Sequence, residues 1–319
     1  MVQPEVSAVS VLTVRHVTTY AYRQPVAFGE HRMMLRPREG YDQRLLDARL
    51  RITPEPSQLR WVHDVFGNNV AVARFTGRAR QLRFESVIRI DHTAQNALDY
   101  HVEDYAASYP FAYAMEEMPD LARSIERHYP DPARAVDRWA RTFLRPDGPT
   151  GTLDLLTAMT HGIRQGLTYI PRHERGIQDP ARTLKLGSGT CRDFAVLMIE
   201  AARSLGLAAR FVSGYLYSPG REAARDSARR GGGNTHAWVR VYLPGAGWVE
   251  FDPTNGIVGN RDLIRVAVTR DPRQAVPLHG TWTGFPADNL GMTVEVSVTS
   301  ADAATASLGD NSHADPRRV

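Results

Sequence analysis

Cysteine is nearly absent from this chain, which holds one, Cys191, in 319 residues. A single cysteine excludes an intramolecular disulfide and a zinc site made of several thiolates. Long hydrophobic runs are absent too, since no segment approaches the roughly 18 apolar residues of a membrane helix. The first residues, MVQPEVSAVSVLTVRHV, lack the basic start and apolar block of a signal peptide. We therefore expect a soluble, cytoplasmic protein with no membrane partner.

A strong charge of either sign is also lacking, because 39 Lys and Arg stand against 35 Asp and Glu. The arginines are scattered and form no basic stripe with interleaved aromatics, so we expect no nucleic-acid partner. The 11 histidines form neither an H-E-x-x-H motif nor a tight His/carboxylate cluster, and LKLGSGT lacks the Lys-Ser/Thr ending of a phosphate loop. The sequence therefore predicts neither a bound metal nor another cofactor.

Short alternating segments rich in branched and aromatic residues fill residues 10–92, from VLTVRHVTTYAY to LRFESVIRI. Turn residues separate them, and DVFGNNV is typical of a hairpin because its glycine and asparagines tolerate positive φ. This pattern predicts a β-sandwich or barrel-like module over residues 1–95.

Apolar residues then recur at spacings of three and four in PDLARSIERHY, DPARAVDRWARTFL and TLDLLTAMTHGIRQGL, which predicts helices. We place a helical connection at 96–150.

Strand patterns return after residue 208, in ARFVSGYLY, THAWVRVYL, GWVEFDPT, RVAVTR and MTVEVSVTS. Together with a helix that starts near Cys191, they predict an α+β core over 151–300, interrupted by a long irregular stretch before that helix. The charged, glycine-ended segment 218–234 is longer than a usual connection and is either a mobile lid near the site or a tolerated surface insertion. The polar residues 301–319 predict a disordered tail.

The stretch GSGTCRDFAVLMIEAARSLGL, residues 187–207, places the single cysteine at the start of a helix. Apolar residues recur on one helical face, Gly206 suits the C-terminal stop, and Thr190 with Asp193 matches a capping box. Cys191 is then the first helical residue, where backbone N–H groups and the helix dipole stabilise a thiolate. A free cysteine is more often a buried structural residue, so a catalytic interpretation requires a partner base.

The segment THAWVRVYL offers that base. Strand periodicity puts His236, Trp238 and Tyr242 on the face opposite the apolar core face, so His236 projects toward solvent or a cleft. If the following PGAG turn pairs Tyr242 with Trp248, Asp252 becomes a diagonal neighbour of His236, within side-chain hydrogen-bond reach. A slip of one residue would move Asp252 to the other face.

Cys191, His236 and Asp252 would then act as nucleophile, base and orienting carboxylate. His236 takes the thiol proton and later gives it to the leaving amine, while Asp252 fixes the imidazole tautomer and stabilises its cation. The backbone N–H of Cys191 is a natural oxyanion donor. The arrangement predicts thiol acyl-enzyme chemistry on an amide bond.

Two long motifs, GTCRDFAVLMIEAARSLGLAARFVSGYL and THAWVRVYLPGAGWVEFDPTNG, resemble the core of the bacterial transglutaminase-like superfamily. RHVTTYAYRQPVAFGEHRMMLRPR with WVHDVFGN is similar to the β-rich module that often precedes that core in bacteria. The resemblance covers roughly residues 10–300. It implies a papain-like α+β fold and the same three catalytic residues, in the order Cys191, His236, Asp252.

The resemblance also bears on residues around the nucleophile. An upstream aromatic or polar residue often completes the oxyanion hole in this superfamily, and Tyr169 of LTYIP is the candidate, with a packed aromatic as the alternative. Arg192 stands where animal transglutaminases typically have tryptophan, so neither their substrate tunnel nor their calcium dependence is carried over. Trp238 and Trp248 are expected either to wall the substrate cleft or to pack against the N-terminal module.

Three functions remain open from the sequence. Hydrolysis of a peptide or amide needs only an open cleft and is favoured, with a peptide or protein as substrate. Acyl transfer from a glutamine side chain to an amine needs a second channel that excludes water. A non-catalytic scaffold on the same fold is the third. The N-terminal module either shapes substrate access or stabilises the core.

Overall fold

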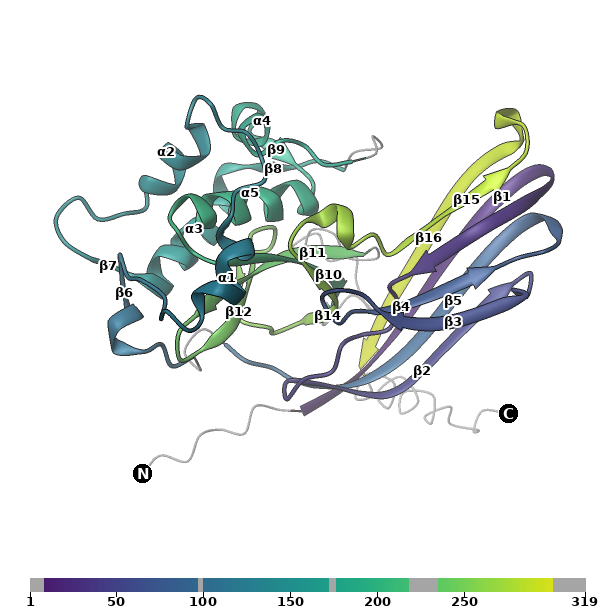
Figure 1. Ribbon diagram of the computed structural model, residues 1–319, viewed down its shortest axis with the longest axis horizontal. Helices are drawn as coiled ribbons and strands as arrows, with labels where there is room; N and C mark the ends of the chain where they lie inside the picture. The colour runs from purple at the N-terminus through teal and green to yellow at the C-terminus, as the bar shows by residue number, and fades with distance from the viewer. Residues whose placement is uncertain (1–8, 97–99, 172–175, 218–234, 301–319) are drawn as a thin grey trace, which may run out of the picture.

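The structure is a computed structural model that describes residues 9–96, 100–171, 176–217 and 235–300. The predicted lid or insertion at 218–234 and the predicted tail at 301–319 lie outside these residues. The described chain forms two halves side by side, with helices around a short-stranded sheet in one half and long strands in the other (Figure 1). In the part of the chain that the structure describes, no helix is long and apolar enough to cross a membrane.

The long-stranded half is one seven-stranded antiparallel sheet, which confirms the β-rich character expected for the N-terminal residues. Its strands are β1 (Val9–Met33), β2 (Gln43–Thr53), β3 (Gln58–His63), β4 (Asn69–Arg74), β5 (Arg78–Thr93), β15 (Leu278–Thr283) and β16 (Asn289–Ser300). β1 is central: β5 and β16 flank its first part, and β4 and β15 flank its end. The DVFGNNV hairpin is present, with His63 opposite Asn69 and Gly67 at a φ of 75°.

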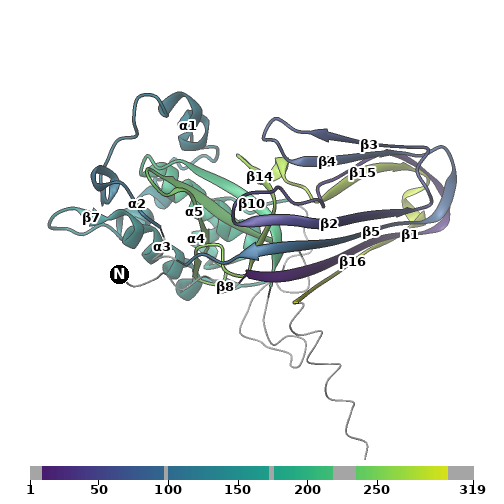
Figure 2. The ribbon, with the colours of Figure 1, turned by 90° about the horizontal axis from the view of Figure 1, so that it is seen from below.

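The last two strands differ from the predicted domain division, which placed 151–300 in the catalytic core. Residues 278–300 instead complete the N-terminal sheet, and β16 pairs with β1 from Leu12 to Tyr22 (Figure 2). The alternating pattern of MTVEVSVTS identifies a strand but carries no information about which sheet it joins. The chain thus leaves the first sheet, builds the core, and returns.

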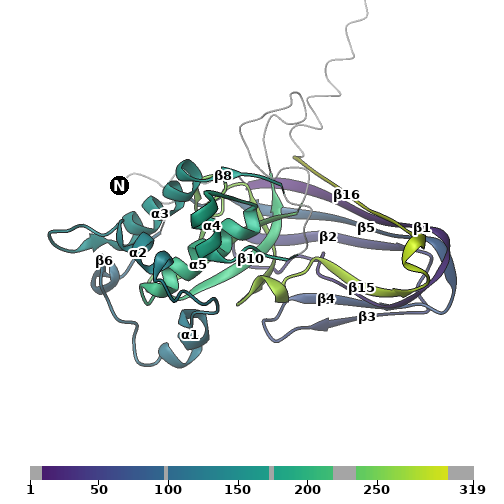
Figure 3. The same ribbon diagram turned by 90° about the horizontal axis from the view of Figure 1, so that it is seen from above.

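The other half surrounds α5 (Cys191–Ser204) and a five-stranded sheet in the order β13-β12-β11-β10-β14. The strands are β10 (Ala209–Leu216), β11 (His236–Leu243), β12 (Gly247–Asp252), β13 (Ile257–Val258) and β14 (Leu263–Thr269), and the other helices are α1 (Met118–Ile125), α2 (Ala135–Arg141), α3 (Thr152–Gly166) and α4 (Pro180–Leu186). Two short ladders, β6 (Ser108–Tyr109) with β7 (Thr150–Gly151) and β8 (Thr168–Tyr169) with β9 (Ser188–Gly189), complete it. α5 is buried almost throughout and packs on β10 and β11, with the other helices around it (Figure 3).

Helix α4 lies where the sequence analysis expected an irregular stretch. It has seven residues, too few for a hydrophobic period to stand out. Local signals nevertheless define its ends: the Asp179 carboxylate accepts the Ala181 N–H at 2.9 Å, Pro180 occupies the first turn, and Gly187 ends the helix at a φ of 60°.

The two halves share a buried interface. Apolar side chains of β1 and β5 pack against Tyr215, Ile264 and Val266 of the half that contains α5. Beside them, Arg265 donates to Asp42 at 2.8 and 3.0 Å and to Glu250 at 2.7 Å. Burial raises the pKa of Asp42, but the hydrogen bonds from Arg265 outweigh it and lower that pKa to about 2.

Removing the cation of this cluster should be costly. We expect Arg265→Ala to lower the free energy of unfolding by about 3–5 kcal/mol, because the buried carboxylates of Asp42 and Glu250 would lose the cation that binds both of them. Urea unfolding followed by circular dichroism measures the change, with the exposed Arg89→Ala as the matched control. A loss below about 1 kcal/mol would contradict the prediction and indicate that water reaches the cluster.

Candidate active site

The first turn of α5 fixes the backbone of Cys191. Thr190 and Asp193 form the predicted capping box: the Asp193 carboxylate accepts the Thr190 N–H at 2.8 Å, and the Thr190 hydroxyl accepts the Asp193 N–H at 3.4 Å. The same carboxylate accepts the Gln178 N–H at 2.7 Å, which ties the preceding loop to the helix start. Cys191 is the first helical residue, as expected, and its side chain is largely buried.

The hairpin of β11 and β12 has the predicted register. Tyr242 lies opposite Trp248, and this alignment brings His236 Nε2 to 2.8 Å from Asp252 Oδ2. Both side chains are fully buried, so of the two expected surroundings of His236, solvent or a cleft, the structure excludes open solvent. The imidazole is covered by Trp238, whose ring stacks on it at a centroid distance of 5.9 Å.

The turn after β12 holds the Asp252 carboxylate. Oδ1 accepts the N–H groups of Thr254 at 2.9 Å and Asn255 at 3.3 Å. Oδ2 accepts the Asn255 side-chain amide at 2.7 Å in addition to its contact with His236. Asn255 was missed in the sequence analysis, although Asp-Pro-Thr-Asn is typical of a turn in which an aspartate binds the backbone that follows it.

Electrostatics favour an imidazolium next to the thiol. Burial lowers the pKa of His236, but the Asp252 carboxylate and the neighbouring Cys191 sulfur raise it more, so the net shift is upward. Burial raises the pKa of Asp252, and the His236 cation with its hydrogen bond outweighs this and lowers it. Nδ1 of His236 has no oxygen or nitrogen partner among the described residues, which leaves it for the Cys191 thiol.

Tyr169 lies on the Cys191 side of the site. β8 pairs in parallel with β9, so that Tyr169 is aligned with Gly189, two residues before the cysteine. Its ring packs edge-on against Phe194 at 6.5 Å. Burial, and secondarily the charge on Cys191, raises the pKa of Tyr169 to about 12, so its hydroxyl remains a hydrogen-bond donor. Its oxyanion role remains a prediction.

The two tryptophans do not form an open cleft wall. Trp238 is fully buried among apolar side chains of β10 and β14 and supports the His236 ring from behind. Trp248 is at the other end of the hairpin, where it packs against Tyr242 and lies under the Arg210 guanidinium at 4.1 Å. Period-two patterning assigns residues to a face but does not show what covers that face.

The side chain of Arg192, which follows Cys191, makes its contacts inside the protein. Its guanidinium donates to the Ala275 carbonyl at 3.1 Å and lies over the Phe211 ring at 5.6 Å. Burial lowers the pKa of Arg192, while the nearby Cys191 and Asp193 charges oppose that change. The side chain therefore anchors the start of α5 to the segment after β14.

Asn255 is a positioning residue whose loss should be measurable. We expect Asn255→Ala to lower the rate of Cys191 alkylation or substrate turnover about tenfold, because one hydrogen bond to the Asp252 carboxylate disappears. A KM unchanged within twofold would separate positioning from substrate binding. Asn255→Gln, which can restore the amide contact, should recover part of the rate. Equal rates for wild type and Asn255→Ala would contradict the assignment.

Fold and site define a class: a papain-like α+β fold with a cysteine at a helix start and a His–Asp pair on adjacent strands. The comparisons agree. The family described as "Bacterial transglutaminase-like N-terminal region" matches residues 12–91, and the "Transglutaminase-like superfamily" matches residues 137–253. The chain thus carries a region similar to the bacterial transglutaminase-like N-terminal region, followed by a region that matches the transglutaminase-like superfamily.

Relatives extend over nearly the whole chain. An uncharacterized protein of Mycobacterium leprae, ML0607, is 28% identical and matches 90% of this chain and 98% of its own length. An uncharacterized protein of Mycobacterium tuberculosis, Rv2569c, is 29% identical over 91% of this chain and 93% of its own. A candidate cysteine protease from Cytophaga hutchinsonii shares the fold with a TM-score of 0.67 at 18% identity, covering 93% of this chain and 92% of that one.

Proposed function

We propose that the protein is a transglutaminase-like cysteine hydrolase that cleaves peptide or amide bonds. The observation that carries this proposal is the His236–Asp252 hydrogen bond of 2.8 Å beside a cysteine at the first position of α5. Both members of the pair are buried, so the pair keeps its geometry without competition from water. A peptide or protein is the substrate that fits this chemistry.

The first half of the reaction forms a thioester. His236 Nδ1 takes the Cys191 proton, and the sulfur attacks the amide carbon, with the Cys191 N–H and the Tyr169 hydroxyl as donors to the oxyanion. The imidazolium then protonates the leaving amine as the C–N bond breaks. In the second half, His236 removes a proton from water, hydroxide adds to the thioester, and the sulfur leaves and recovers its proton.

Acyl transfer to an amine is the alternative that shares the first half. The two differ only in whether water or an amine accepts the acyl group, which depends on how far the site excludes water. Incubation with a glutamine peptide and a labelled primary amine separates them: we expect release of the free acid and ammonia. Amine incorporation without hydrolysis would overturn hydrolysis in favour of transfer.

A non-catalytic scaffold is the third candidate, and labelling with an electrophilic peptide library tests it. We expect the wild-type chain to be modified at Cys191 and the Cys191→Ala variant to remain unlabelled. A wild-type labelling rate equal to that of a free thiol, with no pH dependence near neutrality, would favour the scaffold.

A further inference from the structure

The core-facing end of the long-stranded sheet holds a basic cavity of about 390 Å³. Arg36 and Arg38 line it from the segment between β1 and β2, and His63 and Asn69 line it from the β3–β4 hairpin. Glu39 is the one acidic side chain among the described residues that line it, and that side chain is exposed. We call this cavity, defined by Arg36, Arg38 and His63, the basic pocket.

The two guanidinium groups of the basic pocket have no carboxylate bound to them among the described residues. Arg36 lies over the Trp61 ring at 5.9 Å. Arg38 is half-buried, and the nearby acid that acts on it is Asp64. The Asp64 carboxylate is already occupied, because it accepts the Asn68 N–H at 2.8 Å and the Asn68 side-chain amide at 2.8 Å. Both arginines are therefore available to an anion.

Other cations crowd the same place. Burial and the neighbouring Arg265 lower the pKa of Arg38, and burial and Arg38 lower the pKa of Arg210. The carboxylates of Asp42 and Glu250 are bound to Arg265 and are not directed at Arg38. The guanidinium groups around the pocket therefore repel one another. A bound anion would reduce this repulsion.

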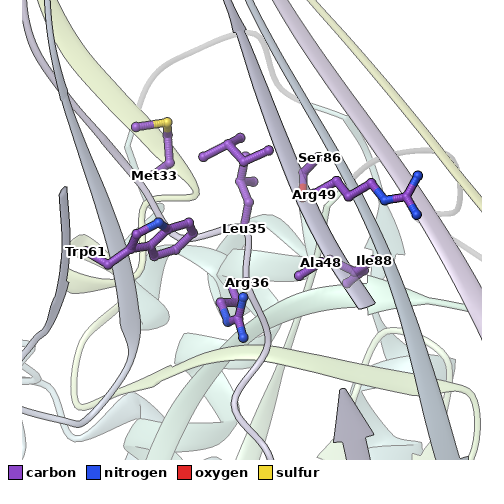
Figure 4. A pocket seen from close by; sticks show the side chains of 9 residues that line it. Met33, Leu35, Arg36, Ala48, Arg49, Trp61, Ser86 and Ile88 are labelled. Carbon is purple, nitrogen blue, oxygen red and sulfur yellow. The ribbon is translucent and has the colours of Figure 1, made fainter. Parts of the chain in front are cut away.

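An open strand edge leads away from the basic pocket. β2 and β3 are the two terminal strands of the sheet, at opposite ends of the order β2-β5-β1-β4-β3, and among the described residues β3 pairs only with β4. Leu59 and Trp61 of β3 are 42% and 45% exposed, although they are large and apolar. Trp61 and Ile88 lie on opposite sides of a small gap with Leu35 and Arg36 between them (Figure 4). An unpaired edge with apolar side chains suits an extended polypeptide, which would pair with it through main-chain hydrogen bonds.

We propose that the basic pocket binds a carboxylate of an acidic polypeptide segment that extends along the free edge of β3. Arg36 and Arg38 donate to the carboxylate oxygens, and His63 flanks them. Inorganic phosphate could use the same donors, but it would leave the β3 edge and its exposed apolar side chains unused. That the bound segment belongs to a substrate rests on the proposed function, whereas binding itself does not.

Fluorescence anisotropy with the full chain carrying Cys191→Ala tests the proposal without turnover. The probe is a fluorescein-labelled octapeptide of alternating glutamate and valine. We expect the double variant Arg36→Gln/Arg38→Gln to bind at least tenfold more weakly, and the matched variant Arg89→Gln, an exposed arginine on β5, to bind within twofold of the parent. A glutamine-for-glutamate peptide should also bind at least tenfold more weakly.

Edge pairing has its own readout. A peptide N-methylated at alternate residues keeps its carboxylates but loses main-chain donors, so we expect at least tenfold weaker binding. Unchanged affinity of the double variant, or of the glutamine peptide, would overturn the carboxylate site. Phosphate binding that requires both arginines, without any peptide binding, would overturn the polypeptide assignment.

The thermal midpoint of the double variant shows that it folds, and salt dependence of wild-type binding gives a second test. Loss of thiol reactivity in the wild type would count against the proposed function and leave this result untouched.

Discussion

Cys191→Ala is expected to abolish amide cleavage, with a loss on the order of 10⁴-fold or more, because the acyl-enzyme cannot form without a sulfur nucleophile. Iodoacetamide should modify the wild-type cysteine at pH 6 at least tenfold faster than a free thiol, whose pKa is about 8.5. The cause is the His236 imidazolium, which the raised pKa keeps charged at that pH. Mass spectrometry of the alkylated peptide against time measures the rate.

The control is His236→Ala, which leaves the cysteine and its helix in place. Alkylation of this variant should slow toward that of a buried free thiol and should rise with pH through the range where free thiols ionise. If wild type and His236→Ala reacted alike across pH 5–9, the ion pair would not be the source of reactivity. Thermal unfolding of each variant distinguishes a chemical effect from loss of the fold.

Asp252→Asn is expected to lower kcat/KM by about 10³–10⁴-fold with little change in KM. The surrounding turn explains why so small a change costs so much. The N–H groups of Thr254 and Asn255 both point at the Oδ1 position and hold the amide oxygen of an asparagine there. Its NH₂ group must then face His236 Nε2 and donate to it. The ring proton moves to Nδ1, where the imidazole can no longer accept the thiol proton.

The free energy of unfolding of Asp252→Asn should also fall below that of the wild type, by an amount that depends on pH. The raised pKa of His236 means that its contribution is full below the ordinary histidine pKa of about 6.5 and is lost as pH rises through the raised value. The lowered pKa of Asp252 means that its contribution is full above about 3.9 and is lost as pH falls through the lowered value. The deficit in the free energy of unfolding of Asp252→Asn relative to wild type should therefore be largest between about pH 4 and 6.5.

Urea unfolding at pH 5, 7 and 9 measures this deficit, with the exposed Asp147→Asn as a control that should stay level across the series. A deficit that grows from pH 5 to pH 9 would contradict the sign of the His236 shift. A deficit equal in wild-type and His236→Ala backgrounds would show that Asp252 acts through the turn alone.

The positions of Cys191, His236 and Asp252 relative to their elements were predictable because each rests on a local rule. A capping box fixes where α5 begins, and the hairpin register fixes which face Asp252 takes. The surroundings of the site were not predictable by the same rules. Whether Trp238 meets solvent depends on β10 and β14, which are distant in sequence, and the support that Asn255 gives depends on the conformation of one turn.

The division of the chain was the least predictable feature. β16 has the pattern of a half-buried strand, and either sheet could accept such a strand. Its partner is set by backbone pairing with β1 over eleven positions, from Leu12–Ser300 to Tyr22–Asn289, which no local pattern encodes. Helix α4 shows the opposite case, in which Asp179-Pro180 and Gly187 mark an element too short for periodicity to reveal.

Because β16 pairs with β1, this strand pair can form only at the end of synthesis. Residues 12–22 leave the ribosome long before residues 289–300, so one edge of β1 stays unpaired while the whole half that contains α5 is made. Cys191, His236 and Asp252 are therefore synthesised before the strand that closes the sheet beside them. A nascent or truncated chain that ends after β14 would hold Cys191, His236 and Asp252 and yet display a long, unprotected strand edge, which makes it a client for chaperones and a seed for aggregation.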